Sequence, residues 1–235
     1  ANDYLDGVKG TDTPDRIGPR RAVASGEIPA PVMRRAAVSV LILGFCPGLA
    51  LLPFGAWWLL AVGLASVTCA WCYTGGPYPL AYNGLGDLFV VLFFGLIAVG
   101  ASYYVQTGAL VLDALLLGLG CGLLINNLLV VNNYRDIEGD TKAGKNTLVV
   151  RFGRGFALAQ CRTASLVASL VLIVLSLRGA GLWILLGLLP AVSGLRLAEC
   201  LQRAQSAEDF LACLRIAGRA VVSYGILVSL GLLLP

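Results

Sequence analysis

The chain of 235 residues is strongly apolar, with 58% hydrophobic residues, only 13% charged residues and a mean hydropathy of +0.83. A soluble domain has roughly 45–50% apolar and about 25% charged residues, so this composition excludes a soluble globular protein and predicts an integral membrane protein. Because the sequence contains no histidine, any chemistry must depend on carboxylates, amides, tyrosines and basic side chains. No nucleic acid and no obligate protein partner are expected.

Residues 1–32 form a polar segment that begins with acidic side chains and ends with basic ones. We interpret this segment as a first Asp-rich motif followed by a cytoplasmic loop. Carboxylate and asparagine oxygens are ligands that suit Mg²⁺. The candidate metal ligands of this segment are Asn2, Asp3, Asp6 and Asp12, and its candidate phosphate-binding bases include Arg16 and Arg20.

Seven apolar runs follow, and a bilayer core requires about 20 apolar residues for each helix. They predict an all-α, multi-span transmembrane helical bundle, with residues 1–235 forming a single transmembrane domain. The predicted spans are 33–52, 54–73, 86–105, 109–133, 153–177, 179–200 and 212–234.

The basic residues are distributed unevenly between the two sides of this bundle. Six lie in residues 1–35, five in 135–154 and four in 196–219, whereas only Arg178 lies on the opposite side. Since cytoplasmic loops are rich in Lys and Arg, both acidic motifs are predicted to face the cytoplasm. We expect the protein to reside in a bacterial plasma (inner) membrane.

The cytoplasmic loop 74–86 lies between two predicted spans and is rich in tyrosine, glycine and proline. The loop contains Tyr78 and Tyr82, and Tyr73 directly precedes it. They could cap an apolar tunnel. An aromatic belt at the membrane interface explains them almost equally well.

A second polar stretch, NNYRDIEGDTKAGKNTLVVR, occupies residues 132–151 and lies largely within the predicted loop 134–153. If the preceding helix continues through it, Asn132, Asp136 and Asp140 are spaced four residues apart and share one face. Acidic side chains at a helix C-terminus are unfavourable without a compensating cation. This placement favours a bound metal or a basic partner, and Lys145 and Arg151 follow directly.

The two polar stretches resemble each other, since residues 2–6 read NDYLD and residues 132–136 read NNYRD. Repeated helical units that share a cavity are common in membrane proteins, so a transporter for an anionic substrate is one alternative. The acids lie where apolar runs end, whereas transporter sites lie near the bilayer midplane. Two magnesium-binding clusters flanked by bases, above an apolar bundle, favour an enzyme that acts on a lipid pyrophosphate.

Residues 2–26, 73–95 and 132–153 closely resemble the UbiA superfamily of intramembrane aromatic prenyltransferases, and the similarity extends along essentially the whole chain. The nearest branch is the menaquinone-pathway enzymes, which prenylate 1,4-dihydroxy-2-naphthoate. The resemblance implies a nine-span bundle in which two Asp-rich motifs hold Mg²⁺ and a polyprenyl pyrophosphate. Ionisation then gives an allylic cation that an aromatic acceptor captures, with loss of the acceptor's carboxylate in this branch.

The resemblance also implies roles for individual residues. The residues expected to act in catalysis are Asp6, Asp136, Asp140 and Lys145. The residues expected to bind substrate are Arg16, Arg20, Lys145, Arg151, Tyr73, Tyr78, Tyr82 and Asn133.

Two features differ from the pattern of the wider family. The acid expected four residues after Asp6 is replaced by Gly10, and Asp12 follows two residues later. Because the first motif lies at the start of the chain, one to two N-terminal helices are expected to be missing. The acidic motifs do not distinguish among naphthoate, homogentisate, hydroxybenzoate and chlorophyllide acceptors.

Overall fold

The computed structural model describes residues 1–11, 20–54 and 57–234, and the regular structure within these ranges is entirely helical. This confirms the predicted all-α class. The first half of the chain contains α1 (Asn2–Lys9), α2 (Ala30–Leu49), η1 (Leu52–Phe54), α3 (Trp58–Cys72), η2 (Ala81–Asn83), α4 (Gly86–Val90), η3 (Val91–Ile97) and α5 (Ala98–Thr107). The second half contains α6 (Leu112–Arg135), α7 (Ile137–Lys142), α8 (Leu148–Phe152), α9 (Arg154–Leu175), η4 (Ser176–Ala180), η5 (Trp183–Gly187), α10 (Leu188–Ala191), α11 (Ser193–Arg203) and α12 (Ala207–Leu233).

Among the described residues, six helical segments are long and apolar enough to cross a bilayer, whereas seven spans were predicted. The exception is the predicted span 54–73, which contains the shorter helix α3 of 15 residues. At 1.5 Å per residue α3 extends about 22 Å, less than the roughly 30 Å of a hydrocarbon core. The chain around Pro53 forms η1 and a turn, which shortens the helix. The protein is an integral membrane protein.

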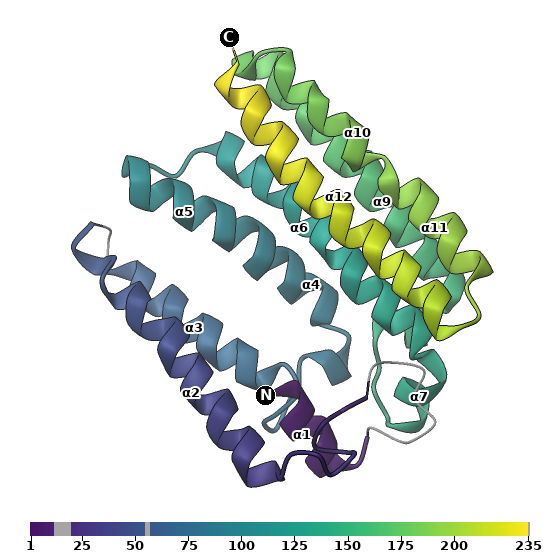
Figure 1. The fold of residues 1–235 in the computed structure, drawn as a ribbon. Helices are drawn as coiled ribbons and strands as arrows, with labels where there is room; N and C mark the ends of the chain where they lie inside the picture. The colour runs from purple at the N-terminus through teal and green to yellow at the C-terminus, as the bar shows by residue number, and fades with distance from the viewer. Residues whose placement is uncertain (12–19, 55–56, 235) are drawn as a thin grey trace.

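Helix α6 lies at the centre of the bundle and contacts η3, α9 and α12 (Figure 1). Its approach to η3 depends on glycine, because a Cβ atom added at Gly95 would lie 2.7 Å from the Cα atom of Gly122. Small residues that let two backbones approach closely are typical of packing between membrane helices.

Two buried clusters pack α6 against its neighbours; both include residues of α9 and α12, and the first also includes residues of α11. One lies toward the end of α6 that precedes α7 and includes Tyr134, Leu201 and Phe210. The other lies farther along the bundle and includes Leu124 and Leu172. These four helices therefore form the packed part of the protein.

Helices α2 and α3 lie side by side, separated from the packed helices by α4 and α5 (Figure 1). No residue of either helix is buried, although both are described along their whole length. Their contribution is to form one wall beside α1.

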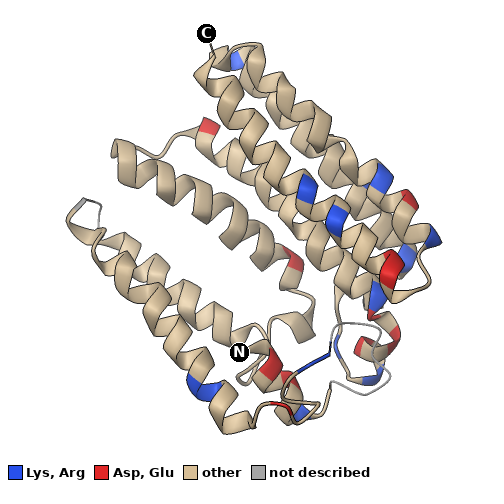
Figure 2. Cartoon of the chain, in the orientation of Figure 1, with Lys and Arg blue, Asp and Glu red and all other residues tan. Residues whose placement is uncertain are grey.

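Most charged residues lie toward the end of the bundle that holds α1 and α7 (Figure 2). At the opposite end, Asp113 at the start of α6 forms an ion pair of 2.7 Å with Arg178. The two polar motifs therefore share one end of the molecule.

Candidate active site

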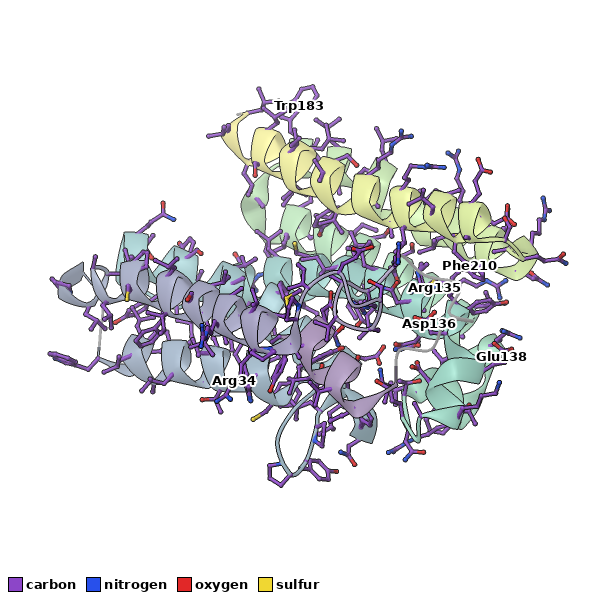
Figure 3. All side chains as sticks on the ribbon, turned by 60° about the horizontal axis from the view of Figure 1, so that its bottom comes forward. Arg34, Arg135, Asp136, Glu138, Trp183 and Phe210 are labelled. Atoms are coloured by element: carbon purple, nitrogen blue, oxygen red, sulfur yellow. The ribbon has the colours of Figure 1, made fainter. Side chains whose placement is uncertain are left out.

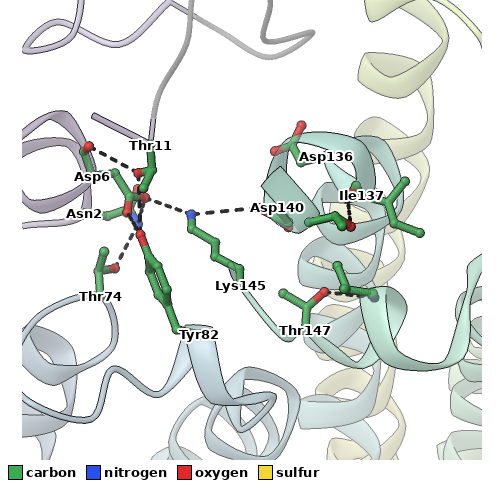
Figure 4. Close-up of polar contacts among 12 residues, drawn as sticks. Asn2, Asp6, Thr11, Thr74, Tyr82, Asp136, Ile137, Asp140, Lys145 and Thr147 are labelled. Carbon is green, nitrogen blue, oxygen red and sulfur yellow. Dashed lines mark hydrogen bonds and ion pairs between the residues drawn. The ribbon is translucent and has the colours of Figure 1, made fainter. Parts of the chain in front are cut away.

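Asp6 on α1 is buried, with an exposed fraction of 1% for the whole residue. Its Oδ1 atom accepts a hydrogen bond of 2.9 Å from the Tyr82 hydroxyl. Its Oδ2 atom accepts hydrogen bonds from Asn2 at 3.1 Å and from the Lys145 ammonium at 3.2 Å (Figure 4). Asp6 is thus bonded to three other residues that were expected to belong to the site.

Other residues of the first motif stabilise the segment around it. The amide of Asn2 also donates to the Thr74 hydroxyl at 2.9 Å, which attaches α1 to the loop after α3. The Asp3 carboxylate accepts two backbone N–H groups, from Ala22 and Val23, each at 3.2 Å. Asp3 therefore holds the returning chain against α1.

Three further residues of this segment were predicted to belong to the site. Asp12 and Arg16 lie outside the described residues. Arg20 forms an exposed ion pair of 3.0 Å with Glu27.

The second motif lies at a bend between α6 and α7. Helix α6 ends at Arg135, and Asp136 has φ −92° and ψ 9° before α7 begins at Ile137. The preceding helix therefore does not continue unbroken through the motif, because Asp136 leaves the helical conformation, and α6 ends within two residues of the predicted end of the span 109–133. The backbone N–H groups of Asp136 and Asp140 still bond to carbonyls four residues earlier, at 2.9 and 2.8 Å, so the two aspartates remain one turn apart.

Asp136 pairs with its neighbour Arg135, a partner that the sequence reasoning missed. The guanidinium donates two parallel hydrogen bonds of 2.7 and 2.8 Å to the carboxylate, and Arg135 is only 5% exposed. Figure 3 labels both residues near the α6–α7 bend. Bidentate pairs of this kind fix both position and orientation. A buried arginine within an acidic motif could have suggested such a pair.

Lys145 connects the two motifs. Its ammonium lies 3.2 Å from Asp6 Oδ2 and 3.8 Å from Asp140 Oδ1, between α1 and α7 (Figure 4). All three side chains are largely buried, with exposed fractions of 17%, 2% and 13% for Lys145, Asp6 and Asp140. One cation therefore bridges two carboxylates that are 134 residues apart in the sequence.

Tyr82 in the loop after α3 completes this cluster. The ammonium groups of Lys9 and Lys145 lie 4.5 and 5.0 Å from the centre of its ring, distances that permit cation–π attraction. Burial and the neighbouring negative charge of Asp6 raise the pKa of Tyr82 to about 12. The phenol therefore remains a hydrogen-bond donor at physiological pH.

The loop that carries Tyr82 is attached to the segment after α7. The Tyr82 carbonyl accepts the backbone N–H of Asn146 at 2.9 Å, and Arg151 donates to the Asn83 carbonyl at 3.0 Å. Gly84 has φ +75°, and a Cβ atom there would lie 2.9 Å from the Asn146 carbonyl oxygen. Only glycine satisfies both requirements. Arg151 thus contacts the loop.

The other two tyrosines of this loop differ in position. Tyr73 is half-buried at the end of α3, whereas Tyr78 is 60% exposed. The structure therefore places Tyr73 and Tyr82 at the site and Tyr78 at the surface.

A mainly apolar cavity of about 460 Å³ begins at the first motif. It extends between α3 and the α4–η3 segment. Its lining residues include Asn2, Tyr73, Thr74, Leu80, Phe89 and Phe93. A polar group bound at the motif and an apolar chain bound in this cavity would therefore lie next to each other.

The remaining predicted residues lie on α6 close to the bend. Asn133 is buried with an exposed fraction of 8%, and Asn132 is half-buried. Within the described ranges, no group of three or more acidic or cysteine residues lies close enough to hold a metal without other ligands.

An all-helical membrane bundle with a charged cluster at one end, next to an apolar cavity, defines a class of protein: an intramembrane enzyme that acts on a lipid substrate. Comparison with known proteins gives the family. The model of the UbiA prenyltransferase family matches residues 1–218. The chain belongs to this family and is a prenyltransferase.

Three relatives from different bacteria share one name. The 1,4-dihydroxy-2-naphthoate octaprenyltransferase of Mycobacterium tuberculosis is 37% identical over 97% of this chain and 77% of its own length. The enzyme of the same name from Mycobacterium leprae is 39% identical over 97% of this chain and 77% of its own length. The one from Escherichia coli is 44% identical over 65% of this chain and 52% of its own length.

Proposed function

We propose that this chain transfers a polyprenyl group from a polyprenyl pyrophosphate to an aromatic acceptor, specifically 1,4-dihydroxy-2-naphthoate. The observation that carries the proposal is the Lys145 bridge, which brings Asp6 of the first motif and Asp140 of the second motif to one point. The shared name of the relatives supports the naphthoate acceptor.

The geometry supports a lipid pyrophosphate as the donor. Asn2 belongs both to the hydrogen-bonded cluster around Asp6 and to the lining of the apolar cavity. A pyrophosphate bound at the cluster would therefore leave its hydrocarbon chain at the mouth of the cavity. Burial of that chain contributes roughly 0.8 kcal/mol for each CH₂ group, which favours a long prenyl donor.

We propose Mg²⁺ as the metal that accompanies the pyrophosphate. Mg²⁺ is usually held by one or two carboxylates together with substrate phosphates, which is compatible with the spacing of Asp6 and Asp140. Asp136 would contribute from the bend, although its pairing with Arg135 fixes its direction. When bound, the metal would neutralise charge that develops on the leaving pyrophosphate.

Lys145 is the residue that we expect to respond to substrate. In the structure its ammonium balances the two carboxylates. When a metal pyrophosphate supplies positive charge to the carboxylates, the ammonium becomes available to a phosphate oxygen. A cation aimed at a leaving group stabilises the transition state for ionisation of the allylic C–O bond.

The allylic cation would be captured by a ring carbon of the acceptor. For the naphthoate we propose that the prenyl group takes the position of the carboxylate, which leaves as carbon dioxide. The product is a demethylmenaquinone in its reduced form. We also propose that both motifs face the cytoplasm of a bacterial inner membrane, as the distribution of basic residues predicts.

The test is transfer of a radiolabelled polyprenyl pyrophosphate to 1,4-dihydroxy-2-naphthoate by membranes that contain this chain. We expect a lipid-soluble product with Mg²⁺ and none after chelation by EDTA. Use of carboxyl-labelled acceptor should release labelled carbon dioxide in equal amount. Product that persists in EDTA would refute the metal assignment, and the absence of product with this acceptor would refute the naphthoate assignment.

A further inference from the structure

Two amide side chains from two other helices meet at Asp87. Asp87 lies at the start of α4 and is 8% exposed. Its Oδ1 atom accepts a hydrogen bond of 3.0 Å from the Asn126 amide on α6 and one of 2.8 Å from the Gln160 amide on α9. Asp87 lies in the first turn of α4, where a negative charge interacts favourably with the helix dipole, and it is also the centre of a polar cluster.

The cluster leaves hydrogen-bonding capacity unused. Because an ionised carboxylate only accepts, both amides turn their NH₂ groups toward Asp87 and their carbonyl oxygens away from it. Asn126 Oδ1 and Gln160 Oε1 are then buried and have no hydrogen-bond partner. Asn126 is only 6% exposed. Buried acceptors without donors are rare in folded proteins, so these two oxygens call for a ligand that donates hydrogen bonds.

The cluster adjoins the site described above. The Tyr73 hydroxyl contacts the position of Gly86, where a Cβ atom would lie 2.9 Å from it. Tyr73 also lines the apolar cavity, and its hydroxyl is within electrostatic reach of both Asp87 and Asp140. Along α6, Asn126 lies about two turns before Asn133. The cluster is therefore deeper in the bundle than the motifs but next to the cavity.

We propose that Asp87, Asn126 and Gln160 form the site that binds one hydroxyl group of the aromatic acceptor, the one farther from its carboxylate, an inference that rests on the proposed function. Asp87 acts as a positioning residue that fixes the two amides. Asn126 Oδ1 and Gln160 Oε1 then offer two acceptor atoms for the hydrogen bond that this hydroxyl group donates.

The charge of Asp87 also predicts how the acceptor is oriented. In the part of the chain that the structure describes, Asp87 forms no ion pair with a basic residue, so its negative charge repels the carboxylate of an acceptor. The acceptor would therefore turn its carboxylate toward the basic end of the site and the hydroxyl group farther from the carboxylate toward the cluster. A ring without that hydroxyl group would leave the amide oxygens without a donor and bind less tightly.

The experiment measures binding directly, so that it does not depend on turnover. The purified full chain in detergent is titrated calorimetrically, under reducing conditions, with 1,4-dihydroxy-2-naphthoate and with 1,4-dimethoxy-2-naphthoate, whose ether oxygens cannot donate. We expect the wild-type protein to bind the dihydroxy compound at least tenfold more tightly. Asn126→Leu and Gln160→Met, which keep the side-chain size, should reduce this preference to less than about threefold.

A matched control is Ser169→Ala on α9, since Ser169 is another buried polar group without a partner in the structure. It lies nine residues after Gln160 and should keep the full preference. Unchanged affinity for farnesyl pyrophosphate would show that each variant is folded.

The proposal is overturned if Asn126→Leu and Gln160→Met keep the tenfold preference, or if the wild-type protein binds both compounds equally. The latter result would mean that water fills the cluster. The transfer assay is run in parallel on the same wild-type preparation. Selective binding without product would contradict the proposed function and support the site. Product without selective binding would support the proposed function and contradict the site.

Discussion

Replacement of Lys145 by methionine tests the connection between the two motifs. Methionine keeps most of the side-chain length and removes the charge. In the structure the ammonium attracts Asp6 at 3.2 Å and Asp140 at 3.8 Å. With an effective dielectric constant of about 20, these attractions are each roughly 4–5 kcal/mol before desolvation is counted.

The net loss of stability is expected to be smaller than this sum. Removal of one partner from a buried ion pair typically costs about 3–5 kcal/mol, because the other charge remains buried. Asp6 keeps its hydrogen bonds from Asn2 and Tyr82, so we expect about 3 kcal/mol. The measurement is denaturant unfolding of the purified protein in detergent micelles, without Mg²⁺ or substrate.

The same variant should lose activity. Removal of one group that stabilises the developing charge typically lowers kcat by about 10²–10³. Lys142→Met on α7 is a matched control, since Lys142 is exposed and should leave both properties nearly unchanged.

A double-mutant cycle gives the decisive result. Asp6→Asn removes the buried charge that Lys145→Met would leave unpaired, so the double variant should be more stable than the sum of the two single effects. Additive effects, or a Lys145→Met protein as stable and active as the wild type, would refute the bridge as an energetic link between the motifs.

Three further predictions follow from the same geometry. Asp140→Asn should abolish transfer while the protein still inserts into the membrane, because the proposed metal would lose a charged ligand; this is checked by the labelled-substrate assay and by extraction with carbonate. Gly95→Ala should lower the free energy of unfolding by about 1–3 kcal/mol, because the new methyl group would meet Gly122 at 2.7 Å, and denaturant titration measures this loss. Tyr82→Phe should reduce kcat about tenfold through loss of the hydrogen bond to Asp6. Because the pKa of Tyr82 is raised from 10 to about 12, its contribution to stability should be complete below pH 10 and lost as the pH rises through 12, and Tyr82→Phe should remove this part of the pH dependence.

Each of these predictions has a result that would contradict it. Normal transfer by Asp140→Asn would remove the second motif from the metal site. A Gly95→Ala protein of unchanged stability would mean that α6 and η3 can separate at little cost. An identical stability profile between pH 10 and 12 for Tyr82→Phe and the wild type would show that the phenol is not specifically stabilised in its neutral form.

The fold class could be predicted from the sequence because the bilayer requires long apolar helices and leaves few alternatives. The length of α3 could not, because hydropathy predicts a break at Pro53 but not that α2 ends at Leu49 and α3 begins only at Trp58. Helical periodicity likewise does not show that the chain bends at Asp136 and starts a new helix directly afterwards. The approach of Asp6, Asp140 and Lys145 was expected from their shared chemistry, and the structure brings them together.

The contacts that sequence did not reveal are of two kinds. The pair between Arg135 and Asp136 is local, but adjacent opposite charges are common and seldom bond to each other. The bonds of Asp87 to Asn126 and Gln160 span 39 and 73 residues, and no periodic pattern relates residues on three different helices. Such contacts are set by how the helices pack.

Tyr82 is attached at both of its ends, with its hydroxyl on Asp6 and its carbonyl on the backbone of Asn146. A single residue, from its hydroxyl to its backbone carbonyl, therefore connects the two motifs. An added or deleted residue next to Tyr82 would have to break one of these bonds, and neither motif can move away from the other while both persist. One tyrosine thus fixes how far apart the two motifs lie.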